Sequence, residues 1–370
     1  MKKTILLLLL IVFFPSISGA TIEVSGSAIH GQSLTITDTE SGFGTKTTPA
    51  PVRFDSFEDG TAGQSVTTEG YWSKRAPATT DFNADTLRNS KTTQNVKVTH
   101  TSTDQGWFYR NGLGFGTSGK AYINFWIYTE YTDGDASWPL KAWRCNADAN
   151  DHNSRPSVAA TNVVAGDDPA TEAQHEYVAW ESDGTQIGSL IGVNAVVPTK
   201  TWINISMAYE LSTLDTSDGN IYFYTSNAPT DSAIRVDSWL NIRTRTTASS
   251  NNIDGLALGY QLTVEDGGVS ALTYFDNVYI DNSWTRVEIG DNATYGLCTH
   301  REIQIETSHD TGTIELTVNQ GSFANGGAFL HVTKEDGTQP YSGIAITLAD
   351  APASTATFSG VAQMTGVIKQ

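Results

Sequence analysis

Helical periodicity is nearly absent from this chain of 370 residues. Short runs that alternate apolar and polar residues are separated by clusters of Gly, Thr, Ser, Asn and Asp. Asp-Gly turn signals recur between the runs, for example at Asp133, Asp218 and Asp336. This pattern argues against a helical fold and predicts an all-β protein.

Long apolar runs are missing beyond the N-terminus. Lys2 and Lys3 precede an apolar run over residues 5–14, and residues 18–20 are small. This pattern is typical of a secretory signal peptide, here residues 1–20, so we expect a secreted protein that is extracellular, periplasmic or held at the cell surface. Because no second long apolar run follows, we expect no membrane insertion.

Basic side chains are scarce. The chain has 22 Lys and Arg against 40 Asp and Glu, which gives a formal net charge of −18 at pH 7. Removal of the two lysines of the signal peptide leaves 20 basic against 40 acidic residues, a net charge of −20. Such a surface repels phosphate backbones and anionic membranes. We therefore expect no nucleic-acid partner, and strongly anionic polysaccharides are disfavoured.

Cysteine is scarce too, with only Cys145 and Cys298 in the chain. Export would permit a disulfide, which would connect two of the domains predicted below. The alternative is that both are unpaired small residues of a core.

The longest clean strand signal covers residues 272–289, where β-branched and aromatic residues alternate with polar ones. The alternation predicts that Tyr274, Asp276, Val278 and Ile280 share one face of the strand. We expect the first half of this segment to close a large sandwich and the second half to enter a smaller domain.

Two distant segments supply the expected parts of that smaller domain. Residues 21–54 contain two short strands and the turn Glu40-Ser-Gly-Phe-Gly, and residues 285–348 contain three alternating strands and a tight turn at Glu335. Together they resemble an IPT/TIG-type immunoglobulin-like domain, which implies one sandwich of about a hundred residues. An insertion, residues 55–284, would interrupt it, and a tail, residues 349–370, would follow it.

The insertion opens with FDSFEDGTAG and closes with YFDNVYID. Between these motifs lie a FWIY strand and a TWINISMAYEL strand followed by a DGNIYFY hairpin. The motifs resemble those of the concanavalin A-like lectin/glucanase (LamG-like) superfamily, which implies a two-sheet jelly roll. The expected fold class is therefore all-β, a jelly-roll sandwich plus a smaller immunoglobulin-like sandwich formed by the N- and C-terminal segments.

One face of several strands in the insertion carries aromatic side chains with polar groups, while alternate residues such as Ile123 and Phe125 should face the other sheet. Aromatic rings with polar groups suit sugars, because rings stack on C–H faces while polar groups bind hydroxyls. We therefore predict a secreted adhesion protein that binds a poly- or oligosaccharide through a concave sheet face. The predicted glycan-binding residues are Tyr122, Asn124, Trp126, Tyr128, Lys141, Trp143 and Trp202, with Asn220, Tyr222 and Tyr224 as an extension.

Catalytic signatures are missing. No Gly-x-Ser-x-Gly, His-Glu-x-x-His or phosphate-loop motif occurs. The nearest match to the Glu-x-Asp-x-x-Glu strand of concanavalin A-like glucanases is residues 181–186, where Gln186 takes the place of the acid and cannot donate a proton. We predict no catalytic residues and lean towards a protein that is not an enzyme.

Two alternative functions stay open. A polysaccharide lyase, or a hydrolase with an unfamiliar site, needs a base and a group that neutralises charge, and Lys141, Arg144, His175 and Tyr177 are of the right types for a lyase. A structural surface or matrix protein would use the same aromatic residues as packing.

Possible calcium ligands stand at both ends of the insertion. Asp55 and Glu58 lie in its opening segment and Asp276 in its closing strand. The resemblance to lectin-like jelly rolls implies a structural Ca²⁺ between these strands, and carboxylate oxygens are the ligands that Ca²⁺ prefers. No other cofactor is expected.

Overall fold

The computed structural model describes residues 22–46, 48–75, 79–100, 106–115, 119–131, 140–150, 157–163, 172–180, 186–198, 200–226, 235–245, 247, 253–262 and 271–350. In the strands between residues 157 and 198, and at a few strand ends, only the backbone is described. The predicted signal peptide and nearly all of the predicted tail lie outside these ranges.

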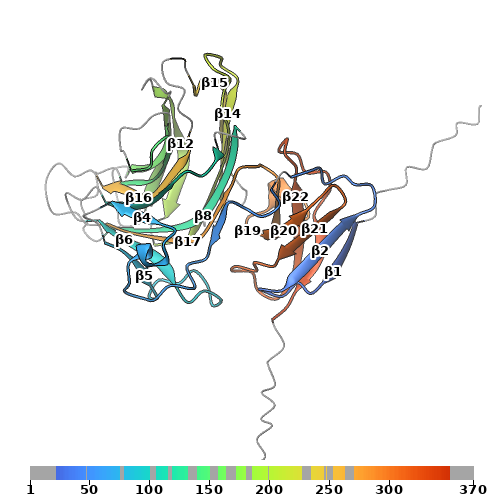
Figure 1. Cartoon of the computed structure of the whole chain (residues 1–370). Helices are drawn as coiled ribbons and strands as arrows, with labels where there is room; N and C mark the ends of the chain where they lie inside the picture. Colours follow the sequence, from blue (N-terminus) through green and yellow to red (C-terminus); the bar gives the residue numbers. More distant parts are fainter. Residues whose placement is uncertain are drawn as a thin grey trace, which may run out of the picture.

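The described strands form four antiparallel sheets, which group into two bodies (Figure 1). We call the body of two larger sheets the large sandwich and the body of two four-stranded sheets the terminal sandwich. The prediction of an all-β fold is confirmed. In the described part of the chain, no helix is long and apolar enough to cross a membrane.

The large sandwich contains a seven-stranded and an eight-stranded sheet. The seven-stranded sheet has the order β12 (Gln186–Pro198), β11 (Glu172–Trp180), β10 (Ser157–Val163), β9 (Leu140–Asn146), β16 (Gly255–Leu262), β7 (Trp107–Asn111) and β4 (Ser73–Arg75). The eight-stranded sheet has the order β15 (Arg235–Ile242), β14 (Gly219–Ser226), β13 (Ile203–Glu210), β8 (Lys120–Tyr131), β17 (Ala271–Asp281), β6 (Asn95–His100) and β5 (Thr79–Asn83), and β3 (Arg53–Asp55) also pairs with β17.

Apolar side chains of both sheets form the core of the large sandwich. Ile123 and Phe125 of β8 and Ile205 of β13 belong to one buried cluster with Trp143 of β9 and Leu256 of β16. Strand side chains alternate between faces, so one face of β8 can fill the core while the other lies outside it. The prediction that Ile123 and Phe125 face the other sheet is confirmed.

Strand β17 departs from strict alternation. Its register against β8 shifts between Asp276 and Tyr279, and Asn277 within the shift has a φ of 48°. Such an irregularity inserts an extra residue and changes which side chains face the core. Val278 and Ile280 therefore lie in the core, whereas Tyr274 packs edge-on against Tyr128 of the same sheet, and the prediction that these residues share one face is wrong.

The terminal sandwich joins the two ends of the chain. One sheet has the order β1 (Ile22–Gly26), β2 (Ser33–Asp38), β21 (Thr313–Thr317) and β20 (Ile305–His309), and the other the order β19 (Arg301–Ile303), β18 (Arg286–Gly290), β22 (Gly326–Thr333) and β23 (Ile344–Leu348). Strands β2 and β21 pair directly, so the blue and red segments lie side by side in Figure 1. Leu34, Ile289 and Leu330 contribute to its separate core. The exact domain bounds and the IPT/TIG resemblance stay predictions.

The terminal sandwich packs against the outer face of the eight-stranded sheet (Figure 1). Tyr122 of β8 and Tyr279 of β17 form a buried cluster with Trp284 and Ile303 from the terminal side. Short 3-10 helices at Val66–Glu69 and Tyr295–Leu297 lie in connections. The outer face of this sheet, where we predicted sugar binding, is therefore shared with a second body.

Candidate functional site

The structure buries the centre of the predicted glycan-binding face. Tyr122, Asn124 and Trp126 are at most 2% exposed. The Trp126 indole N–H donates to the Glu302 carboxylate at 3.2 Å, and its ring meets His300 edge-on, so the terminal sandwich covers it. The prediction that these three residues line an open groove is wrong, because sequence alternation identified their face correctly but could not show what lies on it.

Trp143 and Lys141 do not extend this face. Trp143 is 1% exposed and lies in the core between the sheets, where its ring is 5.9 Å from that of Phe125. A groove position for Trp143 is therefore wrong, because its side chain points into the sandwich. The side chain of Lys141 lies outside the described residues.

Tyr128 and Trp202 form a half-buried aromatic pair at one end of the outer face. Their ring centroids are 5.7 Å apart, and Tyr274 packs against Tyr128 with its ring centroid at 5.4 Å. Burial raises the pKa of Tyr128, and the nearby Glu130 adds to the shift. The structure thus brings these two of the predicted residues together but separates them from Trp143.

A crevice remains where strands β13 and β14 meet the terminal sandwich. Its cavity volume is about 140 Å³, and its lining consists of Ala208, Tyr222, Tyr224, Trp284, Arg286, Asp336 and Gly337. In the sheet register, Ala208 stands between Tyr122 on β8 and Tyr222 on β14. A methyl group between two tyrosines leaves space above the central strand, and this gap forms part of the crevice.

Aromatic rings form the walls of the crevice. Tyr222 meets Trp284 edge-on, with ring centroids 5.6 Å apart and planes at 89°. The Trp284 N–H donates to the carbonyl groups of Ala121 and Tyr209, each at 3.1 Å, which fixes the indole against the sheet. Tyr222 and Tyr224 are only half-buried, so their rings keep surface free for a ligand.

Charged groups border the same crevice. Arg286 is held by Glu288 at 2.9 Å and lies over the Tyr122 ring at 4.1 Å, so its orientation is fixed. Asp336 and Gly337 are exposed, so the crevice opens to solvent at this end. Hydrogen bonds from Thr338 keep the pKa of Asp336 below its usual value, which leaves this carboxylate ionised. Rigid rings beside fixed polar groups can stack on a sugar ring and bind its hydroxyls.

Sequence reasoning placed Tyr222 and Tyr224 only at the edge of the site and missed Trp284, Arg286 and Asp336. Trp284 is the last residue of the predicted insertion, and Arg286 and Asp336 lie in the segment assigned to the other domain. Their residue types carried a usable signal, since Trp284 and Arg286 come directly after the closing strand. Their position depends on how the two bodies pack, which local periodicity does not encode.

Buried ion pairs join the two bodies beside the covered aromatics. Arg88 contacts Asp276 of β17 at 3.1 Å and Glu302 of the terminal sandwich at 2.5 Å. Burial raises the pKa of Asp276 to about 6, against the opposing effect of Arg88. Burial would also raise that of Glu302, but Arg88 and His300 outweigh it and lower its pKa to about 2. Of the two carboxylates, Glu302 therefore stays ionised over the wider pH range and is the main counter-ion of Arg88.

The predicted calcium ligands do not converge on one point. Asp276 pairs with Arg88, and the Glu58 carboxylate accepts hydrogen bonds from the Thr93 backbone N–H at 3.0 and 2.9 Å. Both carboxylates thus have protein partners in place of a metal. The set of Asp55, Glu58 and Asp276 is therefore not a metal cluster, because Arg88 and Thr93 take two of its members.

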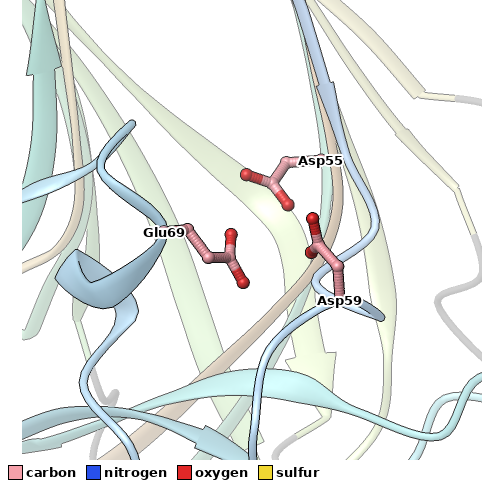
Figure 2. A group of neighbouring side chains, drawn as sticks. All are labelled: Asp55, Asp59 and Glu69. Carbon is pink, nitrogen blue, oxygen red and sulfur yellow. The ribbon is translucent and has the colours of Figure 1, made fainter.

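Asp55 instead belongs to another group of acids. Within the described residues, oxygens of Asp55, Asp59 and Glu69 lie within 4.8 Å of one another, and Figure 2 shows the three carboxylates turned towards a common point. Asp55 already pairs with Arg53, whose guanidinium lies 2.9 Å from its carboxylate, and it accepts from the Trp72 N–H at 2.7 Å. The buried oxygens of Glu69 have no hydrogen-bond donor. Burial and the two neighbouring carboxylates raise the pKa of Glu69 to about 7.

The lyase candidates and the group of Ser322, His300 and Glu302 do not form a catalytic relay in the described part of the chain. Arg144, one of the lyase candidates, is 4% exposed, and the side chains of Lys141, His175 and Tyr177 lie outside the described residues. Ser322, His300 and Glu302 do meet, but the Ser322 hydroxyl and the Glu302 carboxylate contact the same ring nitrogen, at 3.0 and 2.9 Å. A nucleophile–base relay needs the two ring nitrogens to contact different partners.

Comparisons with known proteins find similarity only to solved structures, and at low sequence identity. No family model matches it, and a search of curated proteins returns no match. Solved structures that it resembles in part include the marine PL-14 alginate lyase from Aplysia kurodai, with 14% identity and a TM-score of 0.38 over 54% of this chain and 86% of that one. The endo-β-1,4-glucuronan lyase of the fungus Trichoderma reesei gives 12% identity and a TM-score of 0.37 over 60% and 95%.

The lectin UEA-II, solved in complex with galactose, gives 10% identity and a TM-score of 0.39 over 63% of this chain and 99% of that one. Likenesses at these identities and TM-scores carry no argument about what this chain binds or does. Its assignment to the all-β class rests on its own strands.

Proposed function

We propose that this protein binds a carbohydrate chain in the crevice between the eight-stranded sheet and the terminal sandwich. The observation that supports this most directly is the opening lined by Tyr222, Tyr224 and Trp284, with Arg286 and Asp336 at its border. Half-buried rings offer stacking surface, and the exposed Asp336 carboxylate can accept hydrogen bonds from hydroxyls. The site is shorter than the predicted groove because the terminal sandwich covers Tyr122 and Trp126.

The terminal sandwich has two roles in this proposal. It supplies part of the binding crevice through Trp284, Arg286 and Asp336. It also acts as a rigid support that holds the large sandwich in a fixed orientation. A secreted or surface-held protein with this arrangement would serve in recognition of, or adhesion to, glycans. The crevice is too small to enclose an oligosaccharide, so we expect recognition of one or two sugar units of a longer chain that otherwise stays in solvent.

A structural calcium ion is a further part of the proposal. Asp55, Asp59 and Glu69 would hold it, because their oxygens are close together and Glu69 lacks a donor. Ca²⁺ takes 6–8 oxygen ligands at 2.3–2.6 Å, so backbone carbonyls or water would complete the shell. Its role there would be to neutralise the carboxylates of Asp59 and Glu69 beside the Arg53–Asp55 pair of β3, which pairs with the central strand β17.

A glycan array tests the binding proposal. The protein without residues 1–20 is incubated with a broad set of poly- and oligosaccharides, with and without Ca²⁺, and the same polysaccharides are assayed for new reducing or unsaturated ends. We expect retention of at least one neutral glycan without cleavage. Cleavage would support a lyase or hydrolase instead, and neither retention nor cleavage would support a structural protein.

A further inference from the structure

A second pocket lies on the seam between the two bodies, away from the crevice. Its cavity volume is about 180 Å³, and its lining includes Phe54, Arg88, Asn89 and Asn277 from the large sandwich side and Ile305 and Val318 from the terminal sandwich. A cavity of this size admits a single small ring and not a chain of sugars.

Donor groups without protein acceptors collect at this pocket. The Arg88 side chain is 1% exposed, yet its Nη2 group has no hydrogen-bond partner, and neither has the buried amide nitrogen of Asn89. The Asn277 side chain makes no hydrogen bond with any described residue and sits in the irregular part of β17 with a φ of 48°. Buried donors without acceptors are rare in folded proteins, and strained residues concentrate where a ligand is held.

The charge balance decides which class of acceptor fits. Arg88 is already paired with both Asp276 and Glu302, and Glu58 also lines the pocket. Lys91 adds one positive charge, and its ammonium group donates to the Phe323 carbonyl at 3.2 Å. Two cations against three carboxylates give no net attraction for an anion. The ligand should therefore be neutral and rich in acceptor oxygens.

Apolar side chains also line the seam pocket and restrict which ligand fits it. Phe54, Ile305 and Val318 lie in the same lining as the donor groups. A pyranose ring has an apolar C–H face, which suits the apolar side chains, and a rim of hydroxyl oxygens, which suits the donor groups. We propose that the seam pocket binds one neutral sugar unit and that this ligand joins the two bodies. The inference is independent of the crevice, because the two pockets share no residue.

Titration with small glycosides tests the proposal. The protein without residues 1–20 is titrated with the methyl glycosides of glucose, galactose and mannose and with glucuronate, and binding is followed by saturation-transfer NMR and by the unfolding midpoint. We expect saturable binding of at least one neutral glycoside, with a rise in the midpoint, and weaker binding of glucuronate. A ligand that binds only the folded protein must raise the midpoint.

Two variants locate the binding. Asn89→Ala and Asn277→Gly each remove a side-chain amide, and glycine accepts the positive φ of position 277. We expect at least a tenfold loss of affinity from each. Asn89→Ala also removes the oxygen that accepts from the Lys91 backbone N–H at 2.7 Å, so a small loss of stability of the free protein accompanies it, and Asn277→Gly is the cleaner test. Tyr224→Ala in the crevice is the matched control and should leave glycoside binding at the seam unchanged.

Three outcomes would overturn the proposal: no saturable binding of any glycoside, preference for glucuronate, or binding that both amide variants leave intact. Loss of glycoside binding in Tyr224→Ala alone would assign the ligand to the crevice and refute the seam site. Loss in the amide variants alone would support the seam site even if the crevice binds nothing.

Discussion

Two buried regions of this protein, the core of the large sandwich and the interface between the two sandwiches, are equally inaccessible to solvent but differ in chemistry. Between the sheets of the large sandwich, residues such as Phe125 and Ile205 form an apolar core. Between the large and terminal sandwiches, Arg88, Asp276 and Glu302 are buried to the same degree, at 1% exposure or less. Polar and aromatic residues on a strand face thus indicate an uncovered face, a ligand site or a polar interface, and sequence alone does not separate the three.

The largest effect should come from breaking the charge balance of the interface. Arg88→Leu leaves the carboxylates of Asp276 and Glu302 buried without a counter-ion, and removal of one partner of a buried pair costs about 3–5 kcal/mol. We expect a loss of this size in the free energy of unfolding, measured by urea denaturation.

A triple variant separates charge from packing at the same place. Arg88→Met with Asp276→Asn and Glu302→Gln removes all three charges but keeps most of the volume. We expect it to regain at least half of the stability that Arg88→Leu loses, since buried ion pairs are often replaceable. A triple variant no more stable than Arg88→Leu would contradict the assignment of the loss to uncompensated charge.

A truncation in the apolar core gives the contrasting case. Ile205→Ala should lower the free energy of unfolding by about 2–5 kcal/mol through a cavity, and Ile205→Val by about 0.5–1.5 kcal/mol. Because no charge is involved, the loss should be nearly independent of pH between 5 and 8, unlike that of Arg88→Leu. A loss below about 1 kcal/mol for the alanine variant would show that Ile205 is not in a packed core.

The sequence identified the all-β class and the inward residues Ile123 and Phe125 of β8 correctly, because period-two alternation is a local property. It failed in β17, since the irregularity at Asn277 shifts the pairing by a residue and no composition signal marks it. It also failed for Tyr122 and Trp126, because their cover comes from a segment more than 150 positions later, around Trp284 and Glu302. Local alternation predicts which side chains share a strand face, while long-range packing decides which of those faces remain exposed to solvent.

A smaller effect is expected at the acidic group beside β3. The pKa of Glu69 is about 7 in the fold against an ordinary value of 4.5, so the folded protein binds this proton more tightly. Its contribution to stability is therefore complete below pH 4.5 and is lost as the pH rises to about 7. We expect the unfolding midpoint to fall over this range and Glu69→Gln to flatten the fall, with the exposed Glu23→Gln as control.

Addition of Ca²⁺ extends the same measurement. At pH 8, an ion held by Asp55, Asp59 and Glu69 should raise the unfolding midpoint of the natural protein and leave Glu69→Gln unchanged. An equal rise in both proteins would place any calcium elsewhere.

The smallest effect on stability is expected for aromatic residues on the outer face of the eight-stranded sheet, where Tyr222 and Tyr224 line the crevice and Trp126 is covered. These residues also give the most direct test of the claim that the crevice binds the glycan. The measurement is glycan retention by the double variant Tyr222→Ala, Tyr224→Ala and by Trp126→Phe, each checked for an intact unfolding transition. The account predicts that the tyrosine variant loses at least tenfold in affinity while Trp126→Phe retains the glycan. Loss of retention in Trp126→Phe, with retention intact in the tyrosine variant, would contradict it and restore the covered face as the binding surface.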